Sequence, residues 1–134
     1  MKSLNILLIE DDMIESMKFN RTISTLKLNH HVTEAKNGKD ALEILQKKDE
    51  LPDIILLDLN MPKINGIEFL NILKRDEALR HIPTVVLTTS SNQNDLLECY
   101  KIGISGYVLK PLKYEMYVSK IEKLLAYWSI NELK

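Results

Sequence analysis

Five polar or charged side chains in this sequence stand at the carboxyl ends of short apolar runs. They are Glu10, Asp11, Asp58, Thr88 and Lys110. If the fold brings them together, three carboxylates, a hydroxyl and an ammonium share one crevice. Two carboxylates about 4 Å apart repel each other by roughly 4 kcal/mol at an effective dielectric constant of about 20. One ammonium offsets only part of that charge, and oxygen ligands with open positions suit a hard divalent ion, best Mg²⁺ with retained waters.

The run Ile54–Leu57 and the residues after it form the most informative stretch. Four continuous apolar residues are too few for an amphipathic helix and lack the alternation of a half-exposed strand. They predict a parallel strand that is buried on both faces. Asp58 then lies at the carboxyl end of a central strand, where open α/β sheets bind ligands. Pro62 and Gly66 mark the following loop, although an aspartate here also fits a plain turn cap.

The chain alternates between predicted strands and predicted helices five times. The expected strands are the apolar runs 4–9, 32–35, 54–57, 85–87 and 106–109. Helices are expected over roughly 13–28 and directly after Asn37 and Asn65. A fourth is expected around Leu96, Leu97 and Tyr100, and a fifth has the apolar face Tyr117, Ile121, Leu124, Leu125 and Trp128. This order predicts an α/β fold with a parallel sheet and helices on both faces. A flavodoxin-like doubly wound (βα)5 sheet of strand order 2-1-3-4-5 places the polar strand ends side by side.

Cap residues support three of these helices. Asn37 precedes Asp40 by three residues, and Asn65 precedes Glu68 by the same interval. An N-cap amide followed by an acid at that spacing is typical of a helix start. Gly103 suits the C-terminal end of the fourth helix.

Composition restricts the class of protein. With 134 residues, of which 45% are hydrophobic, we expect residues 1–134 to form a single domain without an output domain. Eighteen basic and nineteen acidic residues leave a formal charge of −1, which favours neither nucleic acid nor a membrane as partner. The lone Cys99 excludes an internal disulfide, and the first residues lack a secretion signal, so a cytoplasmic location is expected. His30, His31 and His81 lack the spacing of a metal site.

Four motifs, in this order and spacing, resemble the receiver domain of two-component response regulators. They are Ile9-Glu10-Asp11-Asp12, Leu57-Asp58-Leu59-Asn60-Met61-Pro62 with Gly66, Leu87-Thr88, and Gly106-Tyr107-Val108-Leu109-Lys110-Pro111. Each motif is weak alone, but together they are specific, and the resemblance covers almost the whole chain. The single-domain chemotaxis regulators are familiar members of this family. The resemblance implies the flavodoxin-like fold and a phosphoprotein that acts as a switch rather than as an enzyme on other substrates.

The resemblance also implies the chemistry at Asp58. This aspartate would accept a phosphoryl group from a histidine kinase or a histidine phosphotransfer protein. Asp11 and Asp58 would bind Mg²⁺, with Glu10 acting through water and Asn60 through its backbone carbonyl. An aspartate is a competent nucleophile for an acyl phosphate, and a metal ion neutralises charge on the transferring oxygens.

Three further roles follow from the resemblance. Lys110 is a mobile charge suited to a phosphoryl oxygen, and Thr88 can donate its hydroxyl to another oxygen after transfer. Tyr107 matches the aromatic residue whose ring turns inward as the Thr88 loop moves. The Lys110–Pro111 peptide bond is expected to be cis, as in the family.

Two positions depart from the family pattern. Thr89 stands where a small residue is usual, which predicts a narrower approach to Asp58. Ser90 follows it and, with Asn60, flanks the path of the hydrolysing water. The run 87–91 also resembles the stand-alone regulators that partner bacterial phytochrome kinases.

Other functions fit parts of the pattern. A phosphorelay shuttle would pass the phosphoryl group to a second histidine, and sequence does not separate it from a switch that binds a downstream protein. A phosphoaspartyl phosphatase needs a second acid two residues beyond its nucleophile, where this chain has Asn60. A flavin site is disfavoured because the acids would repel the cofactor phosphate. The aromatic last helix also suits a homodimer.

Overall fold

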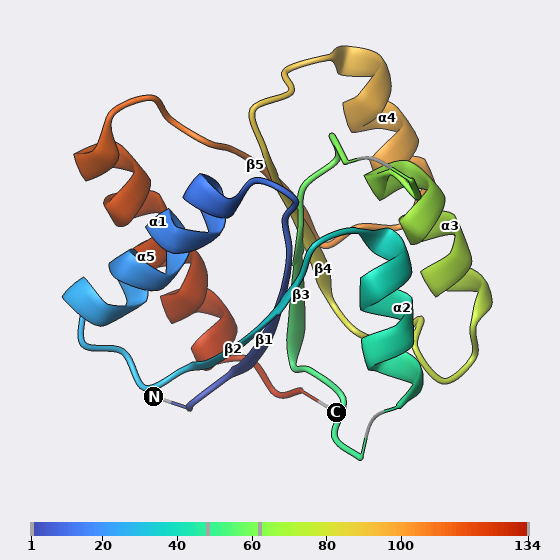
Figure 1. Ribbon diagram of the computed structural model, residues 1–134, viewed down its shortest axis with the longest axis horizontal. Helices are drawn as coiled ribbons and strands as arrows, with labels where there is room; N and C mark the ends of the chain where they lie inside the picture. Colours follow the sequence, from blue (N-terminus) through green and yellow to red (C-terminus); the bar gives the residue numbers. More distant parts are fainter. Residues whose placement is uncertain (1, 48, 62, 134) are drawn as a thin grey trace.

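Within residues 2–47, 49–61 and 63–133, which the computed structural model describes, five parallel strands form one sheet (Figure 1). The strands are β1 (Asn5–Ile9), β2 (His31–Ala35), β3 (Ile54–Leu57), β4 (Thr84–Thr88) and β5 (Gly106–Leu109). Their order across the sheet is β2-β1-β3-β4-β5, so the predicted fold class and strand order are confirmed. The expected turn role of Pro62 lies outside the described residues.

Helices cover both faces of the sheet (Figure 1). They are α1 (Met13–Thr25), α2 (Gly38–Gln46), α3 (Gly66–Arg75), α4 (Gln93–Ile102) and α5 (Tyr114–Ser129). Helices α1 and α5 lie on one face, and α2, α3 and α4 lie on the other. In the described part of the chain, no helix has the length and apolar character required to cross a bilayer.

Alternate residues of the central strands supply two separate cores. Ile55 and Leu57 of β3 pack in the core beneath α2, α3 and α4, whereas Ile54 and Leu56 pack in the core beneath α1 and α5. Because successive strand side chains point to opposite faces, burial on both faces requires an unbroken apolar run. All four residues are fully buried, as the run predicted.

The predicted helix caps are present. The Asn37 side chain accepts a hydrogen bond from the Asp40 amide at 2.8 Å. Asn65 and Glu68 form a reciprocal capping box at the start of α3. Gly103 ends α4 with φ of 122°, a left-handed conformation that glycine adopts without a side-chain clash.

Two helix predictions were wrong in detail. Helix α1 ends at Thr25 rather than near residue 28, because Lys27 adopts φ of 55° and turns the chain. Helix α4 turns Cys99 toward the sheet, so Leu97 and Tyr100, which were expected on its buried face, are 65% and 52% exposed. The rotation of a helix about its axis depends on its packing partners, which a local apolar pattern does not specify.

Candidate functional site

The carboxyl ends of four neighbouring strands meet at one edge of the sheet and form the candidate site. Glu10 and Asp11 follow β1, Asp58 follows β3, Thr88 ends β4, and Lys110 follows β5. One carboxylate oxygen from each of the three acids lies within 4.8 Å of the others. Glu10 and Asp58 are only 6% and 8% exposed, whereas Asp11 is exposed. The structure therefore brings together the five polar and charged side chains that the sequence places at strand ends.

Backbone hydrogen bonds continue beyond the strands and hold these residues in place. The Asp58 amide donates to the Ile9 carbonyl at 3.1 Å, which places Asp58 beside the start of the Glu10 segment. The Lys110 amide donates to the Thr88 carbonyl at 2.8 Å. Because these bonds extend the sheet, the positions of the side chains are set by strand pairing rather than by flexible loops.

Gly66 fixes the segment behind Asp58. Its amide donates to the Leu59 carbonyl at 3.1 Å. A Cβ atom at this position would lie 2.7 Å from the Leu59 Cα and 2.8 Å from the Asp58 carbonyl oxygen. Only glycine lets the first turn of α3 approach the backbone of the candidate nucleophile so closely.

Lys110 is the cation of the site. Its Nζ lies 2.6 Å from Glu10 Oε1 and 3.3 Å from Glu15 Oε1, and its side chain is 6% exposed. Burial by itself lowers the pKa of Lys110, but the hydrogen bond to Glu10 and the charges of Glu10, Asp58 and Glu15 together raise it. The ammonium therefore stays charged at neutral pH.

The two buried acids hold protons more tightly than free carboxyls do. Burial raises the pKa of Glu10 to about 7, with the Asp58 charge adding to the rise and Lys110 opposing it. Burial also raises the pKa of Asp58, whereas the charge of Lys110 and the hydroxyl of Thr88 lower it. One ammonium does not compensate three carboxylates, so a cation added at this point would favour their ionised forms.

The donor set fits a hard divalent cation. Among the residues that the structure describes, three carboxylates converge without histidine or thiolate ligands, and such an oxygen-only set is the chemistry that Mg²⁺ prefers. Asn60, two residues after Asp58, is exposed. The three carboxylates could therefore hold a divalent cation at this edge of the sheet.

A hydrogen-bonded loop connects Thr88 with β5. The buried Thr88 Oγ1 accepts from the Ser90 amide at 3.3 Å, and Ser90 Oγ donates to Asp95 of α4 at 3.0 Å. The Tyr107 hydroxyl donates to the Ser90 carbonyl at 2.9 Å, with its ring half-buried. Thr89, between Thr88 and Ser90 in this loop, is exposed. A movement of Thr88 therefore acts on Ser90, which is also the residue that binds the Tyr107 hydroxyl.

The expected cis peptide before Pro111 was wrong. Among the described residues no peptide bond is cis, so Lys110–Pro111 is trans. Trans is favoured even before proline, by about 0.5–1 kcal/mol, and it needs no special support from the fold.

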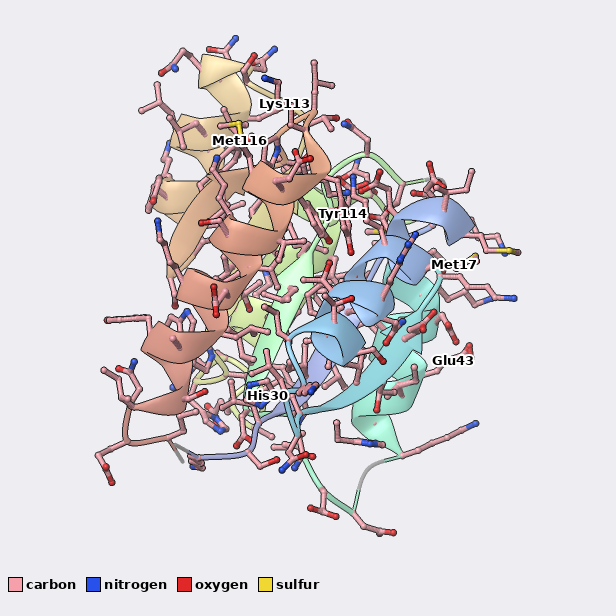
Figure 2. The ribbon with its side chains drawn as sticks, turned by 90° about the vertical axis from the view of Figure 1, so that its left-hand side faces the viewer. Met17, His30, Glu43, Lys113, Tyr114 and Met116 are labelled. Atoms are coloured by element: carbon pink, nitrogen blue, oxygen red, sulfur yellow. The ribbon has the colours of Figure 1, made fainter. Side chains whose placement is uncertain are left out.

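Sequence reasoning missed Glu15 and an apolar surface next to the site. Glu15 lies in the first turn of α1 and contacts Lys110. Met13, Ile14 and Met17, on the same helix, are between 63% and 74% exposed. Figure 2 shows Met17 on the outer side of α1. The available signal was the position of Glu15 in the first turn of α1. This helix follows β1, which ends at the acids of the site, so its first turn lies next to them.

The fold and the acidic strand ends define a doubly wound α/β protein with an acidic cluster at its sheet edge that could hold a metal ion. The response regulator receiver domain family matches residues 6–122, and the chain belongs to this family.

The probable methanogenesis regulatory protein FilR2 of Methanothrix harundinacea is 38% identical over 127 residues, covering 92% of this chain and 82% of that protein. Response regulator Rcp1 of Synechocystis is 32% identical over 128 residues, covering 92% and 87%. The crystal structure of the phosphorylated cyanobacterial phytochrome response regulator RcpA superimposes with a TM-score of 0.91 at 29% identity and covers 98% of both chains. The resemblance noted from the four motifs is therefore confirmed.

Proposed function

We propose that this receiver domain is a cytoplasmic phosphorylation switch in which Asp58 accepts a phosphoryl group from a histidine kinase or a histidine phosphotransfer protein. The observation that carries the proposal is the convergence of Glu10 and Asp11 with Asp58, within 4.8 Å, beside the buried ammonium of Lys110. Such a site concentrates positive charge around a nucleophilic oxygen once a metal ion is present. Membership of the family supports the same conclusion.

Each residue has a defined task in this proposal. Asp11, Asp58 and the Asn60 carbonyl would hold Mg²⁺, with Glu10 acting through water. When bound, the ion neutralises charge on the phosphoryl oxygens and aligns donor and acceptor. Lys110 neutralises a further phosphoryl oxygen.

The transfer itself is a substitution at phosphorus. An ionised oxygen of Asp58 forms the new P–O bond as the bond to the donor breaks, and the donor leaves with the bonding electron pair. With a phosphohistidine donor, the leaving group is an imidazole nitrogen. With acetyl phosphate, the leaving group is acetate.

The switch uses the loop that contains Thr88 and Ser90. After transfer, the Thr88 hydroxyl donates to a phosphoryl oxygen, which draws the loop toward Asp58. Since Tyr107 hydrogen-bonds to Ser90, its ring responds to the same movement. The altered surface of α4 and β5 then binds a downstream protein or a second copy of the chain.

The exposed apolar residues of α1 supply a contact for the phosphodonor protein. Met13, Ile14 and Met17 lie on the helix that begins at the acidic site. An exposed apolar cluster next to a charged site is typical of a protein interaction surface. A small donor such as acetyl phosphate does not require this surface.

Labelling with acetyl phosphate and Mg²⁺ tests the proposal. The wild-type protein should gain one phosphoryl group, detected by intact mass, and Asp58→Asn should gain none. Asp49→Asn, at an exposed position, serves as the matched control and should label like the wild type. Equal labelling of Asp58→Asn and wild type would dismiss Asp58 as the acceptor.

A further inference from the structure

Lys110 contacts two carboxylates, and only one of them belongs to the acid cluster. Glu10 Oε1 lies 2.6 Å from the Lys110 Nζ, and Glu15 Oε1 lies 3.3 Å from it. Glu15 Oε1 is buried and, within the described part of the chain, has no hydrogen-bond partner. This oxygen can therefore accept a full hydrogen bond from the ammonium if Lys110 shifts slightly toward it.

Glu15 is also supported from the opposite side. Its second oxygen, Oε2, lies 3.5 Å from the Lys18 Nζ. The Lys18 ammonium in turn lies 4.5 Å from the centroid of the buried Tyr117 ring, a cation–π contact between α1 and α5. Tyr114 occupies the same region between these two helices (Figure 2), with Arg21 over its ring. The Glu15 carboxylate is thus contacted by a lysine that itself packs against the Tyr117 ring.

The two carboxylates differ in what a metal ion does to them. Glu10 belongs to the cluster of three acids that fits Mg²⁺, whereas Glu15 lies outside that cluster. If the Glu10 carboxylate interacts with a bound cation, Lys110 loses its contact with Glu10, which is its nearest carboxylate. Glu15 then remains as the contacting carboxylate that does not serve the metal.

We propose that Glu15 is a positioning residue that keeps the Lys110 ammonium at the site when Mg²⁺ engages Glu10. This inference rests on the proposed function for the role of Mg²⁺ and of Lys110. Without Glu15, a metal-loaded site would leave Lys110 with no contacting carboxylate outside the metal cluster among the described residues. With Glu15, the ammonium stays near Asp58 and is available to a phosphoryl oxygen.

Amine reactivity tests the position of Lys110 without relying on phosphorylation. Pulse labelling with an acylating reagent, followed by peptide mass spectrometry, reports the reactivity of Lys110 against the exposed Lys39 as internal reference. Wild type, Glu15→Gln and the control Glu43→Gln are compared with and without Mg²⁺. Glu43 is exposed on α2, on the other face of the sheet (Figure 2). Unfolding midpoints show that each variant is folded.

The expected result is specific to the metal-loaded protein. Without Mg²⁺, Lys110 of Glu15→Gln should remain protected because Glu10 still holds it. With Mg²⁺, its labelling should be several-fold faster than in wild type or Glu43→Gln. Two results would overturn the proposal. One is that Lys110 is labelled equally slowly in Glu15→Gln and in wild type when Mg²⁺ is present. The other is that Lys110 of Glu15→Gln is labelled faster than in wild type by the same factor with and without Mg²⁺.

Phosphorylation kinetics supply the second readout. At saturating Mg²⁺, labelling of Asp58 by acetyl phosphate should be roughly tenfold slower in Glu15→Gln, the size expected for one hydrogen bond to a charged group. In a Lys110→Ala background the same substitution should have no further effect, because the two residues act as one unit. An equal tenfold loss in both backgrounds would show that Glu15 acts independently of Lys110. Failure of the wild-type protein to label would instead refute the function of Asp58, while the amine reactivity would still decide the role of Glu15.

Discussion

Raising the pH in the absence of Mg²⁺ should destabilise this protein through Glu10. Burial raises the pKa of this carboxyl from 4.5 to about 7 in the folded state. Between these values the folded protein retains a proton that the unfolded chain has released. The free energy of unfolding decreases with pH wherever the folded state binds more protons, so stability falls as the pH rises through this window.

The expected loss is a sizeable fraction of the stability of a small domain. Each pKa unit corresponds to about 1.4 kcal/mol, so the rise of the Glu10 pKa costs about 3 kcal/mol at high pH. Most of this loss falls between about pH 5 and pH 8, against a typical total of about 5–15 kcal/mol. Glu10 is 6% exposed, so solvent screens the effect only weakly. Mg²⁺ at about one hundred times its dissociation constant should restore about 2.7 kcal/mol.

Urea unfolding at several pH values between 5 and 8 measures the effect, once with a chelator and once with Mg²⁺. Glu10→Gln has no proton to lose at this position and should show a shallower pH dependence than the wild type. Glu43→Gln is the control for replacing an exposed acid, and its pH dependence should match the wild type. Subtracting the free energy of unfolding of Glu10→Gln from that of the wild type at each pH removes the contribution of groups that titrate alike in both proteins.

A wild-type stability that stays constant relative to Glu10→Gln from pH 5 to pH 8 would refute the reasoning. Glu10 would then not be held protonated by the buried acid cluster. Absence of any recovery with Mg²⁺ would separately argue against a cation at this site, since a ligand that binds only the folded state must stabilise it.

Three further predictions concern the surroundings of the site. Gly66→Ala should lower the free energy of unfolding by about 1–3 kcal/mol and slow labelling, because its Cβ would lie 2.8 Å from the Asp58 carbonyl oxygen; an unchanged urea midpoint and labelling rate would contradict this. Met17→Glu should slow phosphoryl transfer from a cognate kinase while leaving labelling by acetyl phosphate unchanged, and equal rates from the kinase would exclude this surface as its contact. Burial lowers the pKa of His30, whose Nδ1 accepts from the Leu4 amide at 3.0 Å, so stability should fall as the pH drops through the titration of this histidine; urea midpoints of His30→Gln should show a weaker acid-side loss, and an identical profile would count against it.

The kinds of elements and their order along the chain could be predicted from the amino-acid sequence. The apolar run Ile54–Leu57 specified a strand covered on both faces, and the caps Asn37 and Asn65 specified where α2 and α3 begin. The cap signals are local, because a backbone amide near a helix start donates its hydrogen bond to a side chain only a few residues away in the sequence. The alternation of strands and helices then restricted the topology to a parallel sheet, and strand ends in such a sheet necessarily share an edge. The convergence of Glu10 with Asp58 followed from that topology.

The contacts between elements could not be predicted from the sequence and are known from the three-dimensional packing. The approach of Glu15 to Lys110 joins α1 to the end of β5, and the outward position of Leu97 and Tyr100 follows from the rotation of α4 on the sheet. The trans bond before Pro111 likewise differs from what the motif alone suggested. Distances and orientations of this kind depend on how whole helices pack, and that packing is the sum of many weak contacts rather than the product of any single motif.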